Sequence, residues 1–181
     1  MKKLSVKTIV AIGIGTALFF LLARFVSIPV FANTTVTFQY AILAFFAAVF
    51  GPIAGLLIGL IGHVLTDLAF GYGLWWSWII VSAILGGAFG LLLEKIDVEA
   101  GKFGMSEIIR FVIVCVVVHL VGWGLIAPVL DILIYAEPAD KVFTQGLIAG
   151  SSNIVTTAIV GSLLLLAYSK TRTQAGSLDQ E

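Results

Sequence analysis

Long apolar runs, separated by isolated charges, dominate this chain. The uncharged runs span residues 8–23, 25–66, 68–93, 111–130 and 142–169. A helix that crosses a bilayer needs about 20 mostly apolar residues, so the run 25–66 is too long for one helix. It contains Gly51-Pro52, where proline lacks a backbone donor and favours a helix start. The pattern therefore predicts an all-α membrane protein, one domain of residues 1–181 with six transmembrane helices at residues 7–28, 38–50, 53–70, 75–93, 108–127 and 145–168.

Lysine and arginine are distributed unevenly about the six predicted helices. Only Arg24 and Lys141 fall on the side of the outer connections. The remaining basic residues lie near the termini or in inner connections, and they are Lys2, Lys3, Lys7, Lys95, Lys102, Arg110, Lys170 and Arg172. Because cytoplasmic segments of membrane proteins carry an excess of Lys and Arg, we expect both termini to be cytoplasmic.

The composition supports a lipid environment. Apolar residues make up 60% of the 181 residues and charged residues only 11%, against about 45–50% and 25% in soluble domains. The first apolar run continues past Arg24 into a chain that is apolar throughout. We therefore interpret it as a retained helix and not as a cleaved secretory signal.

Catalytic, nucleotide-binding and metal-binding motifs are missing from the sequence. There is no Gly-x4-Gly-Lys-Ser/Thr loop for ATP, no His-Glu-x-x-His and no Gly-x-Ser-x-Gly. The single cysteine, Cys115, rules out a Cys-x-x-Cys site. The formal net charge is zero, which removes the basic field that a nucleic-acid partner requires. We expect a protein that is not an enzyme and that uses no cofactor or metal.

Polar side chains at membrane depth are costly to bury and tend to mark function. Asp67 lies near the outer end of its predicted helix, as does Arg24. Two roles are open for Asp67: an ion pair with Arg24 that holds the outer end of the bundle, or contact with a ligand. His63 is one helical turn from Asp67 and shares its face, which favours a structural hydrogen bond.

The fifth and sixth predicted helices place further polar groups at comparable depth. His119 and Trp123 are four residues apart, so a hydrogen-bonding ring lies beside a broad aromatic surface. Asn153, in the last helix, offers both a donor and an acceptor. Either these residues form helix-to-helix hydrogen bonds, or they converge on a ligand.

Aromatic residues gather at the predicted outer ends of the helices, whereas the inner ends have almost no tryptophan or tyrosine. An interfacial belt explains some of them, including Trp75. The asymmetry also predicts an outward-facing pocket in which flat rings stack, with Trp76 among its walls. The segment from Asn33 to Gln39 adds amides and hydroxyls. Asp131, Tyr135 and Glu137, in a predicted outer loop, either cap this pocket or are solvated charges.

Small residues recur at four-residue spacing along the first helix. The two rows are Ala11 with Gly15, and Gly13 with Ala17. Such rows let helix backbones approach closely in lipid. They serve either packing within this subunit or the docking of a partner.

The sequence as a whole resembles the S components (substrate-capture subunits) of energy-coupling factor, or ECF, vitamin transporters. The resemblance rests on six helices with cytoplasmic ends and a polar loop after the first. More specific stretches are residues 5–15 (SVKTIVAIGIG), residues 50–55 (FGPIAG) and the region from Trp123 to Gly146. These stretches look like a branch of the family assigned to hydroxymethylpyrimidine and other thiamine precursors, or to pyridine vitamins.

The resemblance implies a division of labour in a bacterial plasma membrane. An S component captures a vitamin from outside, and a membrane coupling (T) subunit and two cytoplasmic ATPases drive its release. Family members dock through Ala-x-x-x-Ala on the first helix, which corresponds here to Ala11-x-x-x-Gly15 or Gly13-x-x-x-Ala17. The family's binding region maps onto residues chosen above for polarity and depth: Asn33, Gln39, Trp76, His119, Trp123 and Asn153.

Two other functions fit parts of the sequence. A self-contained secondary transporter or channel is one, although such folds usually contain two structural repeats and 181 residues leave little room for them. A small intramembrane enzyme that uses His63 with Asp67, or His119, is the other. No spacing of nucleophile, base and orienting group supports the enzyme.

Overall fold

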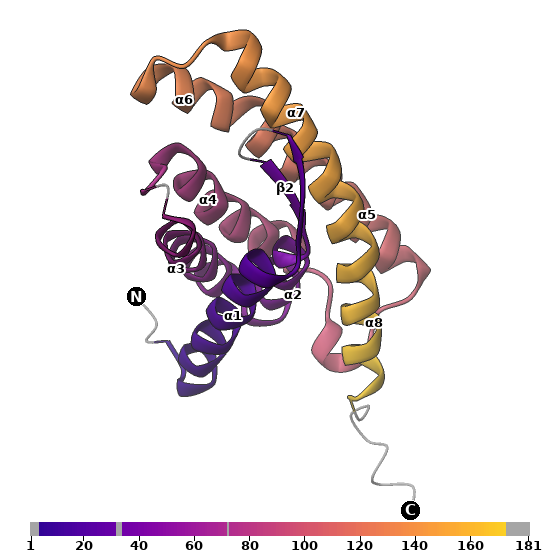
Figure 1. The fold of residues 1–181 in the computed structure, drawn as a ribbon. Helices are drawn as coiled ribbons and strands as arrows, with labels where there is room; N and C mark the ends of the chain where they lie inside the picture. Colours follow the sequence, from indigo (N-terminus) through magenta and orange to yellow (C-terminus); the bar gives the residue numbers. More distant parts are fainter. Residues whose placement is uncertain (1–3, 32–33, 72, 173–181) are drawn as a thin grey trace, which may run out of the picture.

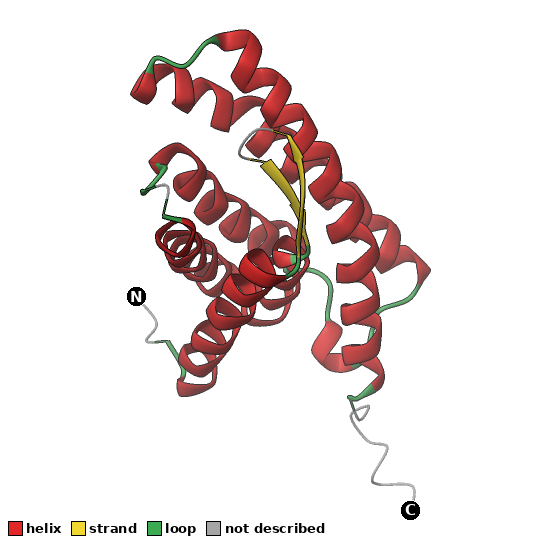
Figure 2. Cartoon of the chain, viewed as in Figure 1, coloured by secondary structure: helices red, strands yellow, loops and turns green. Residues whose placement is uncertain are grey.

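The computed structural model describes residues 4–31, 34–71 and 73–172. The elements form a helical bundle with one small hairpin (Figures 1 and 2). In order they are α1 (Val6–Phe25), β1 (Ser27–Phe31), β2 (Thr34–Thr37), α2 (Gln39–Phe50), α3 (Pro52–Phe70), α4 (Trp76–Leu93), the short 3₁₀ turn η1 (Val98–Ala100), α5 (Met105–Val121), the π-helical segment η2 (Gly122–Ile126), α6 (Ala127–Tyr135), α7 (Ala139–Thr156), the π-helical segment η3 (Thr157–Gly161) and α8 (Ser162–Lys170).

Several of these elements join into longer rods. Met105–Tyr135 is one continuous helix of 31 residues and Ala139–Lys170 another of 32. Together with α1, α3 and α4 they make five helices that are long and apolar enough to cross a membrane, counted over the described residues. The sixth, α2, has 12 residues and is therefore only about 18 Å long. The chain is a multi-pass membrane protein, as the sequence predicts.

The observed helix ends differ from the expected ones in three places. The first helix ends at Phe25 instead of residue 28, and an antiparallel hairpin follows, with Ser27 opposite Thr37 and Ile28 opposite Val36. The fifth helix continues to Tyr135, and the last begins at Ala139. Pro128 lies inside this continuous helix, directly after the π-helical segment η2, where the regular i→i−4 hydrogen bonding that a proline interrupts is already broken.

Helices α3 and α4 pack against each other more closely than any other pair. A Cβ atom added at Gly55 would collide with the carbonyl group of Gly86, and one at Gly59 would collide with that of Ser82. Only glycine permits this approach, which provides dispersion contacts where lipid supplies no hydrophobic drive between helices. The α3–α4 pair is therefore a rigid support for the residues at its outer end.

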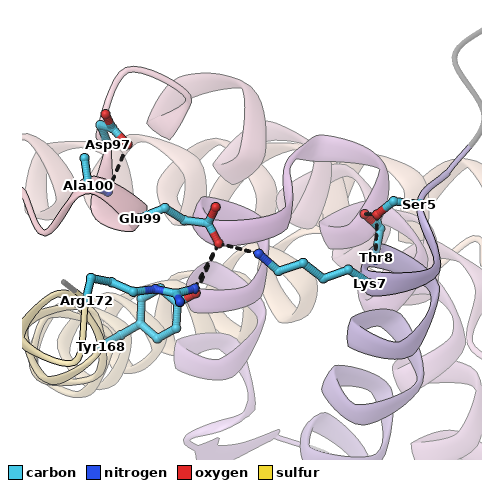
Figure 3. A network of polar contacts seen from close by, with 8 residues as sticks. All are labelled: Ser5, Lys7, Thr8, Asp97, Glu99, Ala100, Tyr168 and Arg172. Atoms are coloured by element: carbon cyan, nitrogen blue, oxygen red, sulfur yellow. Dashed lines mark hydrogen bonds and ion pairs between the residues drawn. The ribbon is translucent and has the colours of Figure 1, made fainter. Parts of the chain in front are cut away.

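The start of α1 and the end of α8 lie at the same end of the bundle (Figure 1). There, Lys7 Nζ lies 2.7 Å from Glu99 Oε1 in the α4–α5 connection, and Arg172 donates to the same oxygen at 3.1 Å (Figure 3). Tyr168 also donates to Glu99, at 3.2 Å. The hydrogen bond from Lys7, with the nearby charges of Lys7 and Arg172, lowers the pKa of Glu99. We call these four residues the cytoplasmic network.

Candidate functional site

Two adjoining cavities open at the end of the bundle opposite the cytoplasmic network. The first, about 280 Å³, lies beneath the hairpin and is called the hairpin cavity. The second, about 310 Å³, is called the acidic cavity and lies among α3, α4, α6 and α7. His63, Asp67 and Trp78 line both cavities. The outer half of the bundle is therefore hollowed, as a capture site requires.

Residues from the hairpin and from α1, α2, α3, α4, η2 and α7 line the hairpin cavity. The hairpin covers one side of it, and β2 packs on α7 (Figure 2). Because α2 is short, its first turn begins well inside the bundle, beneath the hairpin, and brings Gln39 and Tyr40 to the cavity. Its lining residues are Ala23, Ser27, Pro29, Phe31, Thr34, Thr35, Thr37, Gln39, Tyr40, His63, Thr66, Asp67, Phe70, Trp78, Trp123, Ala149 and Asn153.

Three polar atoms in this lining are buried without a hydrogen-bond partner within the described part of the chain. They are Gln39 Oε1, Trp123 Nε1 and Asn153 Oδ1. The exposed fractions of these residues are 7%, 0% and 4%. Buried polar groups in native proteins are nearly always paired, because an unpaired one costs about 1–3 kcal/mol. All three residues line the same cavity.

Aromatic rings form the wall beside these atoms. Trp123 lies in η2, the π-helical segment that follows α5; such π turns occur frequently at functional sites. Its ring centroid is 5.4 Å from that of Tyr40 and 4.9 Å from that of Trp78. A flat ring that enters the cavity therefore meets aromatic surfaces as well as hydrogen-bonding atoms.

Asp131 anchors the wall of the acidic cavity. Its Oδ1 accepts from Trp75 Nε1 at 2.7 Å and from Ser77 Oγ, and its Oδ2 accepts from Trp78 Nε1 at 2.9 Å. Asp131 lies inside α6 and is buried, so the expectation of an outer loop at this position is corrected. The carboxylate fixes two tryptophans in place and does not cap the pocket.

Asp67 faces both cavities. Its Oδ2 accepts from the backbone N–H of Trp75 at 2.9 Å, and its Oδ1 is 3.5 Å from His63 Nε2. His63 Nδ1 is 2.5 Å from Ser82 Oγ, which in turn is 2.9 Å from the hydroxyl of Tyr40. The structure thus supports the structural hydrogen bond expected for His63.

The position of Arg24 does not fit the ion pair with Asp67 that the sequence left open. The Arg24 guanidinium lies over the rings of Phe25 and Phe70, at 5.6 and 5.2 Å from their centroids. Among the described ion pairs, none joins Arg24 to Asp67. Of the two roles left open for Asp67, the ion pair with Arg24 is not found among the described ion pairs, and contact with a ligand stays a prediction.

The structure brings four of the residues chosen from the sequence to the hairpin cavity: Gln39, Asp67, Trp123 and Asn153. His119 lies behind the wall, where its Nε2 is 3.1 Å from Thr157 Oγ1 and its ring contacts Tyr40 edge-on. His119 therefore supports the site and does not line it. Asn33 lies outside the described residues.

The structure corrects the prediction that Trp76 lines the pocket. It is 47% exposed and lines neither cavity, whereas Trp78 lines both. Two residues along a helix turn the side chain by about 200°, so the two tryptophans point to opposite sides of α4. Tyr40 lies in the short second helix that the sequence predicts, and it lines the hairpin cavity although it was not chosen as a binding residue. Gln145 was also missed; it lies in α7, which begins before the predicted last helix, and it lines the acidic cavity.

The two small-residue rows on α1 face different surroundings. Ala11 and Gly15 are buried, and a Cβ atom at Gly15 would press on Phe46 and Ile58. Gly13 and Ala17 are exposed, and nothing lies within 4 Å of a Cβ atom at Gly13. The Ala11 row is internal packing, and the Gly13 row is open for a partner.

Comparison with known proteins gives concordant matches. The family model described as "ECF-type riboflavin transporter, S component" matches residues 3–170. An Enterococcus faecalis protein named UPF0397 is 54% identical over 181 residues, covering 99% of each chain. A UPF0397 protein of an Exiguobacterium species is 52% identical over the full length of both chains. Another, from Staphylococcus aureus, is 47% identical over the full length of both.

Proposed function

We propose that this chain, which belongs to the family of ECF-type riboflavin transporter S components, captures a vitamin or vitamin precursor of pyrimidine or pyridine type from outside the cell. The hairpin cavity is the proposed capture site. One observation carries the proposal: Gln39, Trp123 and Asn153 line one aromatic-walled cavity, and each has a buried polar atom without a partner among the described residues.

Family membership fixes the coarser role of the chain. S components are the substrate-binding, non-enzymatic subunits of ECF transporters. The chain is therefore a substrate-binding subunit in a bacterial membrane, and neither the self-contained transporter nor the intramembrane enzyme considered above applies. Association with an ECF coupling subunit and its ATPases follows from the same membership. What remains to be proposed is the substrate and the surface that docks.

The chemistry of the hairpin cavity supports a small heteroaromatic ring. Side-chain amides offer donors and acceptors together, which matches a ring nitrogen beside an exocyclic amino or hydroxyl group. The indoles of Trp78 and Trp123 supply stacking surface. The first turn of α2 directs the positive end of a helix dipole into the cavity, which favours an electron-rich ring edge. All three features suit a neutral, flat base.

The size of the cavity bears on whether riboflavin, the substrate in the family's description, fits it. Pockets for drug-sized ligands occupy about 300–1,000 Å³, and the hairpin cavity, at about 280 Å³, lies below that range. A single ring can be held within the hairpin cavity alone, whereas the three fused rings and sugar-like chain of riboflavin would also need the adjoining acidic cavity. We therefore place pyrimidine and pyridine compounds ahead of riboflavin.

Intrinsic tryptophan fluorescence of the purified chain tests the proposal, because Trp78 and Trp123 line the cavity. The probes are 4-amino-5-hydroxymethyl-2-methylpyrimidine, pyridoxine and riboflavin. We expect saturable quenching by the first or the second, and weaker or no binding of riboflavin. Preferential binding of riboflavin would contradict the ring class, and binding of none of the three would contradict the proposed substrate altogether.

For the partner, we propose that the Gly13–Ala17 row of α1 docks the coupling subunit. It is the row that faces outward, and small side chains permit close helix contact in lipid. The two ATPases then act through the coupling subunit. Copurification of the tagged chain with all three subunits, and its loss on a bulky substitution in this row, tests the docking surface.

A further inference from the structure

We propose that the acidic cavity is a second subsite of the same substrate and that it takes a positively charged group, a protonated amine or a comparable cation. This inference rests on the proposed function and extends it from the ring to its substituent. The substrate would then be a flat heteroaromatic base with a cationic side group. Neutral and anionic relatives of the same ring would bind less well.

The two cavities adjoin each other, so a substituent of a ring held in one can reach the side chains shared with the other. His63, Asp67 and Trp78 line both, so the boundary between the cavities consists of side chains shared by them. On one side lie the unpaired polar atoms of Gln39, Trp123 and Asn153. A ring held by those atoms has its substituents directed either toward the hairpin or toward Asp67 and the acidic cavity.

The formal charge of the acidic cavity is negative. Its lining includes three carboxylates, from Asp67, Asp131 and Glu137, and one ammonium, from Lys141. Three negative charges and one positive charge leave an excess of two negative charges when His63 is neutral. Such an excess of negative charge attracts a cationic group and repels an anionic one.

The hydrogen bonds show which carboxylate is available to a ligand. Asp131 already accepts from three donors, namely Trp75, Ser77 and Trp78. Glu137 is 2.6 Å from the ammonium of Lys141.

Asp67, by comparison, has hydrogen-bond acceptor positions that are not used. It accepts one backbone N–H at 2.9 Å and is 3.5 Å from a histidine ring, although a carboxylate has about four acceptor positions. Its place between the two cavities makes it the carboxylate that a cationic substituent meets first.

The aromatic lining of the acidic cavity points to the same ligand charge. Trp75 and Trp78 both line it, and indole faces attract cations more strongly than other side-chain rings do. Their N–H groups are held by Asp131, which adds electron density to the rings. An anionic group would meet the same carboxylates and would be repelled.

Two matched series of probes test the subsite. One keeps the 4-amino-2-methylpyrimidine ring and places hydroxymethyl, aminomethyl or carboxylate at its 5-position. The other is pyridoxine, pyridoxamine and 4-pyridoxic acid, which differ in the same way on a pyridine ring. Dissociation constants are measured by fluorescence titration of the full chain in lipid nanodiscs at neutral pH. We expect the amine to bind on the order of tenfold more tightly than the alcohol, and the carboxylate most weakly.

The substitution Asp67→Asn assigns the preference to a residue. In that variant the amine and the alcohol of each series should bind equally, because the amide keeps the size of the side chain but removes its charge. Asp140→Asn is the matched control: Asp140 is exposed on the neighbouring α7 and lines neither cavity. The control should keep the preference of the unmodified chain.

The outcomes separate the two proposals. If compounds of either series bind but the amine has no advantage, the cationic subsite is wrong and the capture of a ring stands. If no compound of either series binds, the proposed substrate fails and this inference fails with it. The ranking measured on the unmodified chain decides the matter even if Asp67→Asn does not fold.

Discussion

At the scale of single residues, three side chains that line the hairpin cavity each bury an unpaired polar atom, which costs free energy in the empty protein. Trp123 is fully buried, yet its Nε1 has no partner within the described chain. Asn153 Oδ1 and Gln39 Oε1 also lack a hydrogen-bond partner within the described chain. Behind the cavity wall, His119 Nε2 is 3.1 Å from Thr157 Oγ1, although His119 Nδ1 also lacks a partner among the described residues. What distinguishes Gln39, Trp123 and Asn153 is that all three line one cavity, where a bound ligand would supply the missing partners.

Trp123→Phe isolates the contribution of the indole N–H. The phenyl ring keeps an aromatic wall beside Tyr40 and Trp78 but cannot donate a hydrogen bond. We expect the dissociation constant of the bound pyrimidine or pyridine to rise by about two- to tenfold, in line with about 0.5–1.5 kcal/mol for one hydrogen bond. Fluorescence or calorimetric titration measures it. Trp76→Phe, on the opposite side of α4, should leave the constant unchanged; an unchanged constant in Trp123→Phe would remove this residue from the site.

Asn153→Leu should separate stability from binding. Leucine branches at Cγ as asparagine does and removes an unpaired buried oxygen, so the empty protein should unfold at a higher temperature, with a gain of up to about 1–3 kcal/mol. Ligand affinity should fall at the same time. Thr157→Val is the control, because it breaks the pair with His119 and should lower stability. A fall in stability of Asn153→Leu would indicate a structural role for the amide.

The sequence identified Gln39, Asp67, Trp123 and Asn153 because polarity at membrane depth is rare and can be read directly. It chose Trp76, where Trp78 lines the cavities, because three tryptophans in four residues give no apolar–polar contrast from which a helix face could be assigned. It placed His119 in the site because depth does not distinguish the surface of a cavity from the layer behind it. That distinction depends on neighbours from other helices, Thr157 and Tyr40.

At the scale of secondary-structure elements, the sequence predicted the long apolar helices but not the β-hairpin or the π-helical segments. Charges and Gly51-Pro52 mark most helix limits. The hairpin was expected only as a polar loop, because β1 is five residues long and contains Pro29, and short strands resemble irregular loops in a single sequence. The π-helical segments left no signal, although η2 contains Trp123.

Helix α1 provides a prediction about docking. Gly13→Leu should abolish copurification with the coupling subunit and ATP-driven uptake, while ligand binding by the isolated chain stays intact. The reason is that the added side chain meets nothing within this subunit but blocks close approach of another helix. Pull-down, uptake and titration measure the three properties.

Gly15→Leu is the matched comparison on the same helix. There the side chain would press on Phe46 and Ile58, so we expect lower thermal stability and reduced ligand binding together. If Gly13→Leu weakened ligand binding as strongly as Gly15→Leu does, the outward row would be internal packing and the docking surface would have to be sought elsewhere.

At the scale of the whole molecule, the substrate site and the cytoplasmic network occupy opposite ends of one bundle. Helix α1 links them: Ala23 near its outer end lines the hairpin cavity, and Lys7 near its inner end contacts Glu99. The network joins α1 to the α4–α5 connection and to the end of α8 (Figure 3). The helix proposed to dock the coupling subunit is therefore fastened to the second half of the bundle at its cytoplasmic end.

Because the pKa of Glu99 is lowered, the stability that the cytoplasmic network contributes depends on pH. A carboxylate whose pKa is lower in the folded state stabilises the fold above its unfolded pKa, about 4.3 for glutamate. That contribution is lost as the pH falls through the folded value. The ion pairs are largely exposed, so the effect should not exceed about 1 kcal/mol. Thermal unfolding of the chain and of Glu99→Gln should therefore differ slightly at pH 7 and converge below about pH 4.

Glu94→Gln is the control for that comparison, because Glu94 is exposed in the same connection and lies outside the network. Its unfolding should follow that of the unmodified chain at every pH. If Glu99→Gln also showed no difference at pH 7, the network would contribute nothing measurable to stability, and α1 would be held by its apolar contacts with α2 and α3 alone. A difference that grew as the pH fell would have the wrong sign for a carboxylate stabilised by Lys7 and Arg172.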